Sequence, residues 1–117
     1  SIDVSRSFVQ QSVAMPTIKV NDTSVSNGGT VSIEDTSLSL NISTGNKNCS
    51  YEVYVNDVLS TSGTGNSATK TIGGLTNGAV IKVVNSRSGY ASQTFTFTVS
   101  VPKTEDMSSS YYTKLPV

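Results

Sequence analysis

Residues 94–101 read Thr-Phe-Thr-Phe-Thr-Val-Ser-Val, an unbroken alternation of large apolar and small hydroxyl side chains. Successive side chains of a β-strand point to opposite faces of the sheet, so Phe95, Phe97, Val99 and Val101 share one face. One apolar face and one polar face are typical of an antiparallel sheet that covers a core on one side. The stretch therefore predicts a half-buried antiparallel strand and an all-β protein.

The same period of two recurs in three runs on the N-terminal side, and no helical period competes with it. The apolar positions of these runs are Leu38, Leu40 and Ile42; Tyr51, Val53 and Val55; and Ala79, Ile81 and Val83. In the third run Val80 and Val84 are apolar too, which predicts burial on both faces of that strand. Shorter strands are expected at residues 17–20, 30–33 and 67–72.

Turn-forming residues separate these runs, and Asn and Gly tolerate the positive φ that tight turns need. The predicted turns are Asn27-Gly28-Gly29, Thr44-Gly45-Asn46, Asn56-Asp57 leading to residues 58–61, a looser loop at 63–65, residues 73–78 and residues 86–89. About seven short strands at this spacing are typical of a sandwich. The prediction is a single immunoglobulin-like antiparallel β-sandwich over residues 16–101, with an N-terminal arm (1–15) and a C-terminal arm (102–117).

The core is expected to contain five apolar residues from these runs and turns: Leu40, Val53, Leu75, Val83 and Phe97. Cys49 is the single cysteine, so no disulfide can form within the chain. A cysteine at the start of a strand is expected to serve as a small buried hydrophobe. The fold must then depend on its core alone.

Two stretches resemble known families. Thr71-Ile72-Gly73-Gly74-Leu75-Thr76-Asn77-Gly78 is similar to a region of fibronectin type III domains in which a leucine plugs the core before a glycine turn. Residues 51–57, together with residues 80–99 and their Ser88-Gly89-Tyr90-Ala91-Ser92 turn, resemble the C-terminal immunoglobulin-like domain of the chitobiase and β-hexosaminidase type. Such domains are appended to many bacterial and phage surface proteins. The resemblance implies an immunoglobulin-like architecture over residues 16–101 and leaves the function open.

Composition excludes several classes of partner. The chain has 117 residues, eight basic and eight acidic side chains, and no basic cluster, so no electropositive surface is expected to hold a nucleic acid. No apolar stretch approaches the roughly 20 residues that span a bilayer, and no signal-peptide pattern opens the chain, so membrane insertion is not expected either.

Catalytic chemistry is not expected. The chain contains no histidine, which excludes Ser-His-Asp and Cys-His catalysis and histidine-bound metals. The acidic pairs Glu34-Asp35 and Glu105-Asp106 are adjacent in sequence, so their side chains are expected to point apart instead of facing each other across a cleft. The predictions are that the protein is not an enzyme and binds no cofactor or metal.

Binding residues are predicted at two kinds of place. Tyr54 alternates outward on its strand, where it would either stack on a sugar ring or cover part of the sheet face. The arms carry large apolar residues that are uncommon in linkers. They are either frayed ends or segments that order against the domain itself, or dock on a protein partner or another copy, through Phe8, Val9, Val13, Tyr111, Tyr112 and Leu115.

The function expected from this pattern is that of a non-catalytic structural or interaction module in a larger assembly. The specific expectation is a phage virion accessory protein, such as a capsid or tail decoration, or a surface-appendage protein, with a virion or cell-surface location. The alternatives are a carbohydrate-binding module of a secreted or surface bacterial protein, and a plain spacer domain.

Overall fold

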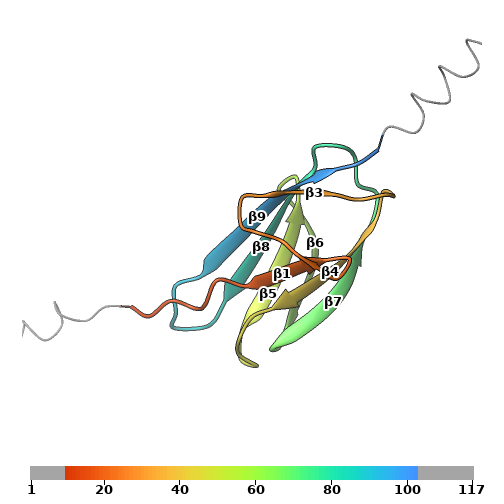
Figure 1. Cartoon of the computed structure of the whole chain (residues 1–117). Coiled ribbons are helices and arrows are strands. Elements are labelled where there is room, and N and C mark those ends of the chain that lie inside the picture. The colour runs from red at the N-terminus through yellow and green to blue at the C-terminus, as the bar shows by residue number, and fades with distance from the viewer. Residues whose placement is uncertain (1–9, 103–117) are drawn as a thin grey trace, which may run out of the picture.

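The computed structural model describes residues 10–102, which form two β-sheets packed face to face (Figure 1). The strands are β1 (Thr17–Val20), β2 (Thr23–Ser24), β3 (Thr30–Ser32), β4 (Leu38–Ser43), β5 (Ser50–Val55), β6 (Val58–Thr64), β7 (Ser67–Ile72), β8 (Val80–Ser86) and β9 (Gln93–Ser100). One sheet has the order β2-β1-β4-β7 and the other β3-β9-β8-β5-β6. The described residues include no helix, so the all-β prediction is confirmed.

The inward-facing side chains of both sheets form one core. All five predicted core residues, Leu40, Val53, Leu75, Val83 and Phe97, are buried. Leu75 reaches the core from the loop between β7 and β8, where its N–H donates to the Thr36 carbonyl at 2.8 Å. Cys49 is also buried and free, as the sequence predicted. The core is therefore built mainly from the apolar positions of the alternating runs.

Three details of the strands differ from the predictions. Residues 10–102 contain nine strands instead of about seven, because a two-residue β2 follows β1 and a full strand β6 follows β5. The pairing of β3 with β9 is parallel, whereas an antiparallel sandwich was expected: the chain turns twice between β1 and β3, at the β1–β2 hairpin and at residues 26–29, before β3 joins the second sheet. Val80 is exposed and Val84 half-buried, so the prediction that both faces of β8 are buried was wrong: no element within residues 10–102 covers these side chains fully.

The tight turn predicted at Asn56-Asp57 is present. Both residues have positive φ (50° and 69°), as the hairpin turn that matches strand twist requires. The strand that follows runs through Gly63 to Thr64, where a loose loop was expected. Tyr51 explains this continuation: a Cβ at Gly63 would lie 2.6 Å from Tyr51 Cζ and would also meet its hydroxyl. Gly63 is thus the place where β6 makes room for a buried aromatic ring.

Replacement of Gly63 by alanine is expected to destabilise the domain by about 1–3 kcal/mol, because the added methyl forces the Tyr51 ring out of its packed position. Chemical denaturation of Gly63→Ala measures this cost. In a Tyr51→Val background, where no ring fills the space, the same substitution should cost much less. Equal costs in the two backgrounds would contradict the proposed contact.

Candidate functional site

The outer face of the five-stranded sheet carries the predicted site residue Tyr54. Register places Tyr54 between Leu59 on β6 and Lys82 on β8. The Tyr54 hydroxyl donates to Glu52 Oε1 at 2.9 Å, so the ring lies along its own strand. This hydrogen bond, followed by desolvation and the charge of Glu52, raises the pKa of Tyr54 above its ordinary value. The ring therefore covers part of the sheet face and keeps its proton.

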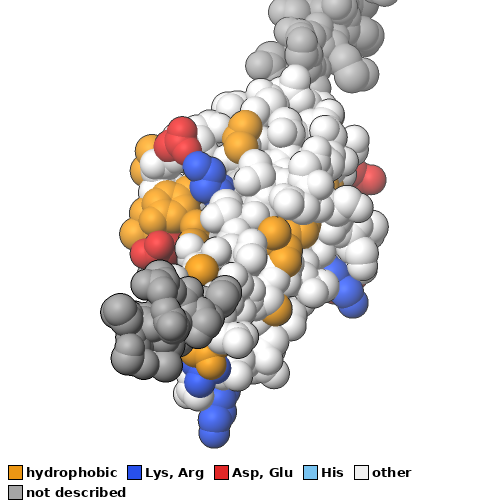
Figure 2. All heavy atoms as spheres, turned by 90° about the vertical axis from the view of Figure 1, so that its left-hand side faces the viewer, with side chains coloured by type: hydrophobic (Ala, Val, Ile, Leu, Met, Phe, Trp, Pro, Cys, Tyr) orange, Lys and Arg blue, Asp and Glu red, His pale blue; other side chains and the backbone are white. Residues whose placement is uncertain are grey.

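Charged and apolar side chains surround this tyrosine. Lys82 Nζ lies 3.1 Å from Asp57 Oδ1, and the Asp57 side chain is 85% exposed, so this ion pair contributes little to stability. Val58 and Leu59 are 68% and 52% exposed at the start of β6. Figure 2 shows hydrophobic side chains beside acidic and basic ones on a surface that is otherwise mostly uncharged. This surface therefore places apolar, acidic and basic side chains close together around Tyr54.

The second feature is an N-terminal strap, residues 11–14, which packs against the domain. Ser12 forms a parallel bridge with Ala91, the Val13 N–H donates to the Ala91 carbonyl at 2.9 Å, and the Ala91 N–H donates to the Gln11 carbonyl at 2.8 Å. Val13 is only 7% exposed. Val13 was predicted to lie in the N-terminal arm, outside the sandwich, as a partner-binding residue; the structure corrects this placement, because Val13 is buried and its backbone pairs with Ala91 of its own sandwich. Residues 11–14 are thus part of the domain.

Asn85 holds the strap through a side-chain hydrogen bond. This fully buried residue of β8 donates from Nδ2 to the Ala14 carbonyl at 2.9 Å and to the Thr44 carbonyl at 3.1 Å. Its Oδ1 is buried without a partner, which is costly and makes the residue's position depend on the two bonds it does form. Sequence reasoning missed Asn85. The signal in the sequence was that Asn85 occupies the next inward-facing position after Ala79, Ile81 and Val83, where a polar residue is unusual.

Beneath the strap lies a cleft of about 200 Å³. Its walls include Val13 and Ala14 of the strap, the buried Cys49, and the pair Arg87 and Tyr90. The Arg87 guanidinium lies 4.6 Å from the centre of the Tyr90 ring, a cation–π contact. The strap and the buried Cys49 therefore line the same cleft.

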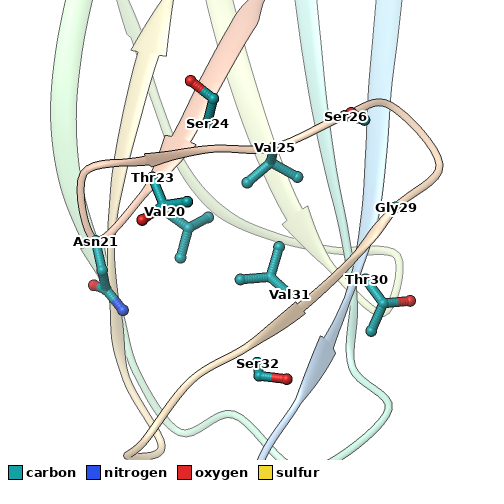
Figure 3. Close-up of a pocket in the computed structure, with 10 residues that line it drawn as sticks. All are labelled: Val20, Asn21, Thr23, Ser24, Val25, Ser26, Gly29, Thr30, Val31 and Ser32. Atoms are coloured by element: carbon teal, nitrogen blue, oxygen red, sulfur yellow. The ribbon is translucent and has the colours of Figure 1, made fainter.

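A larger cleft of about 430 Å³ opens where the chain crosses from one sheet to the other, between β2 and β3 (Figure 3). Val20, Val25 and Val31 point towards one another across it, whereas Ser24, Thr30 and Ser32 point away. No side chain in its lining is charged or titratable. The cleft offers an apolar floor with a hydroxyl rim and no group that could transfer a proton or hold a metal.

The remaining predicted residues are placed as follows. Asp35 accepts the Thr36 N–H at 2.7 Å in an exposed turn, so its carboxylate serves the local backbone. Within residues 10–102 no group of three or more His, Cys, Asp or Glu side chains is arranged to hold a metal ion. In that same part of the chain no helix is long and apolar enough to cross a membrane. Phe8, Val9, Tyr111, Tyr112, Leu115 and the pair Glu105-Asp106 lie outside the described residues.

Comparison with protein-family models, with curated proteins and with solved structures finds no match for this chain.

Replacement of Asn85 by alanine is expected to cost about 1–3 kcal/mol, because the Ala14 and Thr44 carbonyls lose their buried donor. The strap should loosen, so the Val13 amide should exchange faster and Cys49 should react faster with a thiol reagent. In the unchanged protein Cys49 should react slowly in buffer and quickly in denaturant. The neighbouring Ser86→Ala is the control. Unchanged Cys49 labelling in Asn85→Ala would show that Asn85 does not hold the strap over the thiol.

Proposed function

We propose that the chain is a non-catalytic structural or interaction module of a larger assembly, in which the sandwich acts as a spacer between two docking ends. The observation that carries the proposal is the route of the chain. It joins the sandwich beside Ala91, at the turn between β8 and β9. It leaves at Val101, whose N–H donates to Asn77 Oδ1 at 2.9 Å in the loop before β8. These points lie at opposite ends of the domain (Figure 1).

The separation of these two points suits a spacer. They flank the seven residues of β8, a length of about 20 Å at the usual rise of a strand. The entry point is fixed by backbone hydrogen bonds with Ala91, and the exit point by the bond from the Val101 N–H to the Asn77 side chain. Segments that continue from these points would be held apart at a set distance. A domain of this kind can hold two neighbours at once.

The connectivity supports the immunoglobulin-like type of sandwich. β1, β4 and β7 share one sheet, and β5, β8 and β9 share the other, which corresponds to the division between the A-B-E and C-F-G strands of immunoglobulin domains. β6 extends the second sheet beside β5, at the position where variable-type domains add a strand. This architecture is widely used for adhesion and assembly, although the fold alone does not determine the function.

The proposed docking residues are Phe8 and Val9 at one end and Tyr111, Tyr112 and Leu115 at the other. Large apolar side chains in such positions gain stability when a neighbour covers them. The neutral, hydroxyl-rich character of the chain is compatible with a protein or glycan neighbour and gives no attraction for nucleic acid. A phage virion accessory protein, such as a capsid or tail decoration, or a surface-appendage protein is the specific role that we propose.

Amide hydrogen exchange tests the docking role. We expect residues 1–9 and 103–117 to exchange quickly in the full chain free in solution and slowly within the assembly purified from its source. Replacement of Phe8 and Val9 by serine should reduce incorporation into that assembly, whereas Ser5→Ala and Ser7→Ala should not. Fast exchange in both states contradicts docking, and slow exchange in both states assigns the segments to the sandwich itself.

A carbohydrate-binding module is the second candidate, and Tyr54 is the observation that favours it. It is the one aromatic residue on the outer face of the five-stranded sheet within residues 10–102, and hydrogen-bonding side chains of Glu52 and Lys82 flank it. Sugar rings stack on such a platform while their hydroxyls bond to neighbouring polar groups.

Titration with a panel of soluble bacterial cell-wall and capsular oligosaccharides, followed by NMR, tests this second candidate. Shifts that centre on Tyr54 and disappear in Tyr54→Ala, but persist in Tyr90→Ala, would support sugar binding. An absence of shifts across the panel would contradict it.

A further inference from the structure

The two sheets have four edge strands, and three of them are protected against pairing with another chain. An edge strand presents unpaired N–H and C=O groups, which proteins usually blunt by short length or by an inward-pointing charge. β2 has two residues and β3 has three. β7 is longer, but its Lys70 lies opposite the buried Leu40 and so shares the inner face. A strand added beside β7 would have to cover this charge.

β6 is the exception. It has seven residues, Val-Leu-Ser-Thr-Ser-Gly-Thr, with no charge and no proline. Its first two side chains, Val58 and Leu59, are the two most exposed large hydrophobic side chains in the described part of the chain. The register shift in its pairing with β5 lies between Val53 and Tyr54, so residues 61–64 remain in regular register. This regular part is suited to receive another strand.

The alternation of hydrogen bonds shows which groups of β6 face outward. Gly65 N–H donates to the Cys49 carbonyl directly opposite, and Asn56 N–H donates to the Val80 carbonyl on the other side of β5. Because bonded and non-bonded pairs alternate along an antiparallel ladder, Thr61 and Gly63 bond to β5. Ser62 therefore directs both its N–H and its C=O away from the sheet, towards the open edge.

We propose that β6 pairs with β6 of a second copy of this chain, antiparallel and centred on Ser62, so that the two five-stranded sheets form one continuous sheet. The two-fold arrangement gives the two Ser62 residues reciprocal N–H to C=O bonds. The occupant is a second copy because the ends of the edge carry opposite charges. Asp57 precedes β6; it pairs with Lys82 of β8, but its side chain is 85% exposed and can also meet a cation from another copy. The exposed Lys47 lies in the loop at the far end, where the Thr44 hydroxyl bonds to the Gly65 and Asn66 carbonyls.

Antiparallel pairing brings Asp57 of each copy to the Lys47 end of the other, whereas parallel pairing would bring like charges together. The chain's net charge of zero adds no overall repulsion between copies. One strand edge buries less than the roughly 1,200 Å² of a standard stable interface, so the dimer is weak and concentration-dependent. The proposed contact uses only β6 and the charged residues at its two ends, so the inference is independent of the proposed function.

Sedimentation velocity of the full chain from about 10 μM to about 1 mM, the range that suits a weak interface, tests the proposal. We expect a reversible monomer–dimer equilibrium. Ser62→Pro removes the two central donors without breaking a bond to β5, so it should raise the dissociation constant at least five-fold. Thr71→Pro is the matched control on the other long edge strand. The Thr44 N–H donates to the Asn66 carbonyl, so the even-numbered residues of β7 bond to β4. The Thr71 N–H therefore faces outward, as the Ser62 N–H does on β6.

Lys47→Glu is a second variant, which changes an exposed loop residue and leaves the strand intact. It brings two acidic groups together at each end of the dimer, so it should also weaken association, and more so at low salt. Weakening by Ser62→Pro and Lys47→Glu, with Thr71→Pro unchanged and all variants folded by circular dichroism, supports the proposal. A monomer throughout the concentration range overturns it, as does self-association that neither Ser62→Pro nor Lys47→Glu affects, which would assign assembly to another surface.

Discussion

Burial of one apolar face on each sheet is the interaction on which the described domain depends. Leu40 on β4, Val53 on β5 and Phe97 on β9 meet between the sheets, and the one cysteine of the chain is free, so no disulfide within the chain supports them. Each strand can contribute only every second residue to this layer. The alternate residues that face outward need not pack in the core, so these positions can be occupied by the Ser and Thr side chains that dominate the outer faces.

Features at the periphery take their positions from this layer. Tyr51 occupies space in the core that only a glycine on the neighbouring strand leaves open, and this allows β6 to continue as a regular edge. Asn85 occupies an inward position at the end of β8, beyond the apolar part of the layer, and uses it to hold the carbonyls of Ala14 and Thr44. The positions of the strap and of the open edge at β6 therefore follow from packing at the margins of the core.

Most of the strands and their buried faces were predictable, and the candidate binding surfaces were predictable only in part. Alternation located the inward faces of β4, β5, β8 and β9, and the turn-forming pair Asn56-Asp57 located the tight turn before β6. Tyr54 was correctly placed on an outer face, but its bond to Glu52 and its neighbours Leu59 and Lys82 depend on sheet register. Val13 was assigned to the N-terminal arm because nothing near it in sequence pairs with it, whereas its partner Ala91 lies far along the chain.

The sequence by itself determined the class of fold and which side of each long strand is buried, because both follow from a local period that a few residues express. Tertiary structure alone decided which strands became neighbours, and with them the parallel pairing of β3 with β9, the position of Asn85 against Ala14, 71 residues away, and the open edge at β6. The physical reason is that these contacts join segments with no local pattern in common. They form only because packing of the whole core brings the segments together, so no window of sequence contains them.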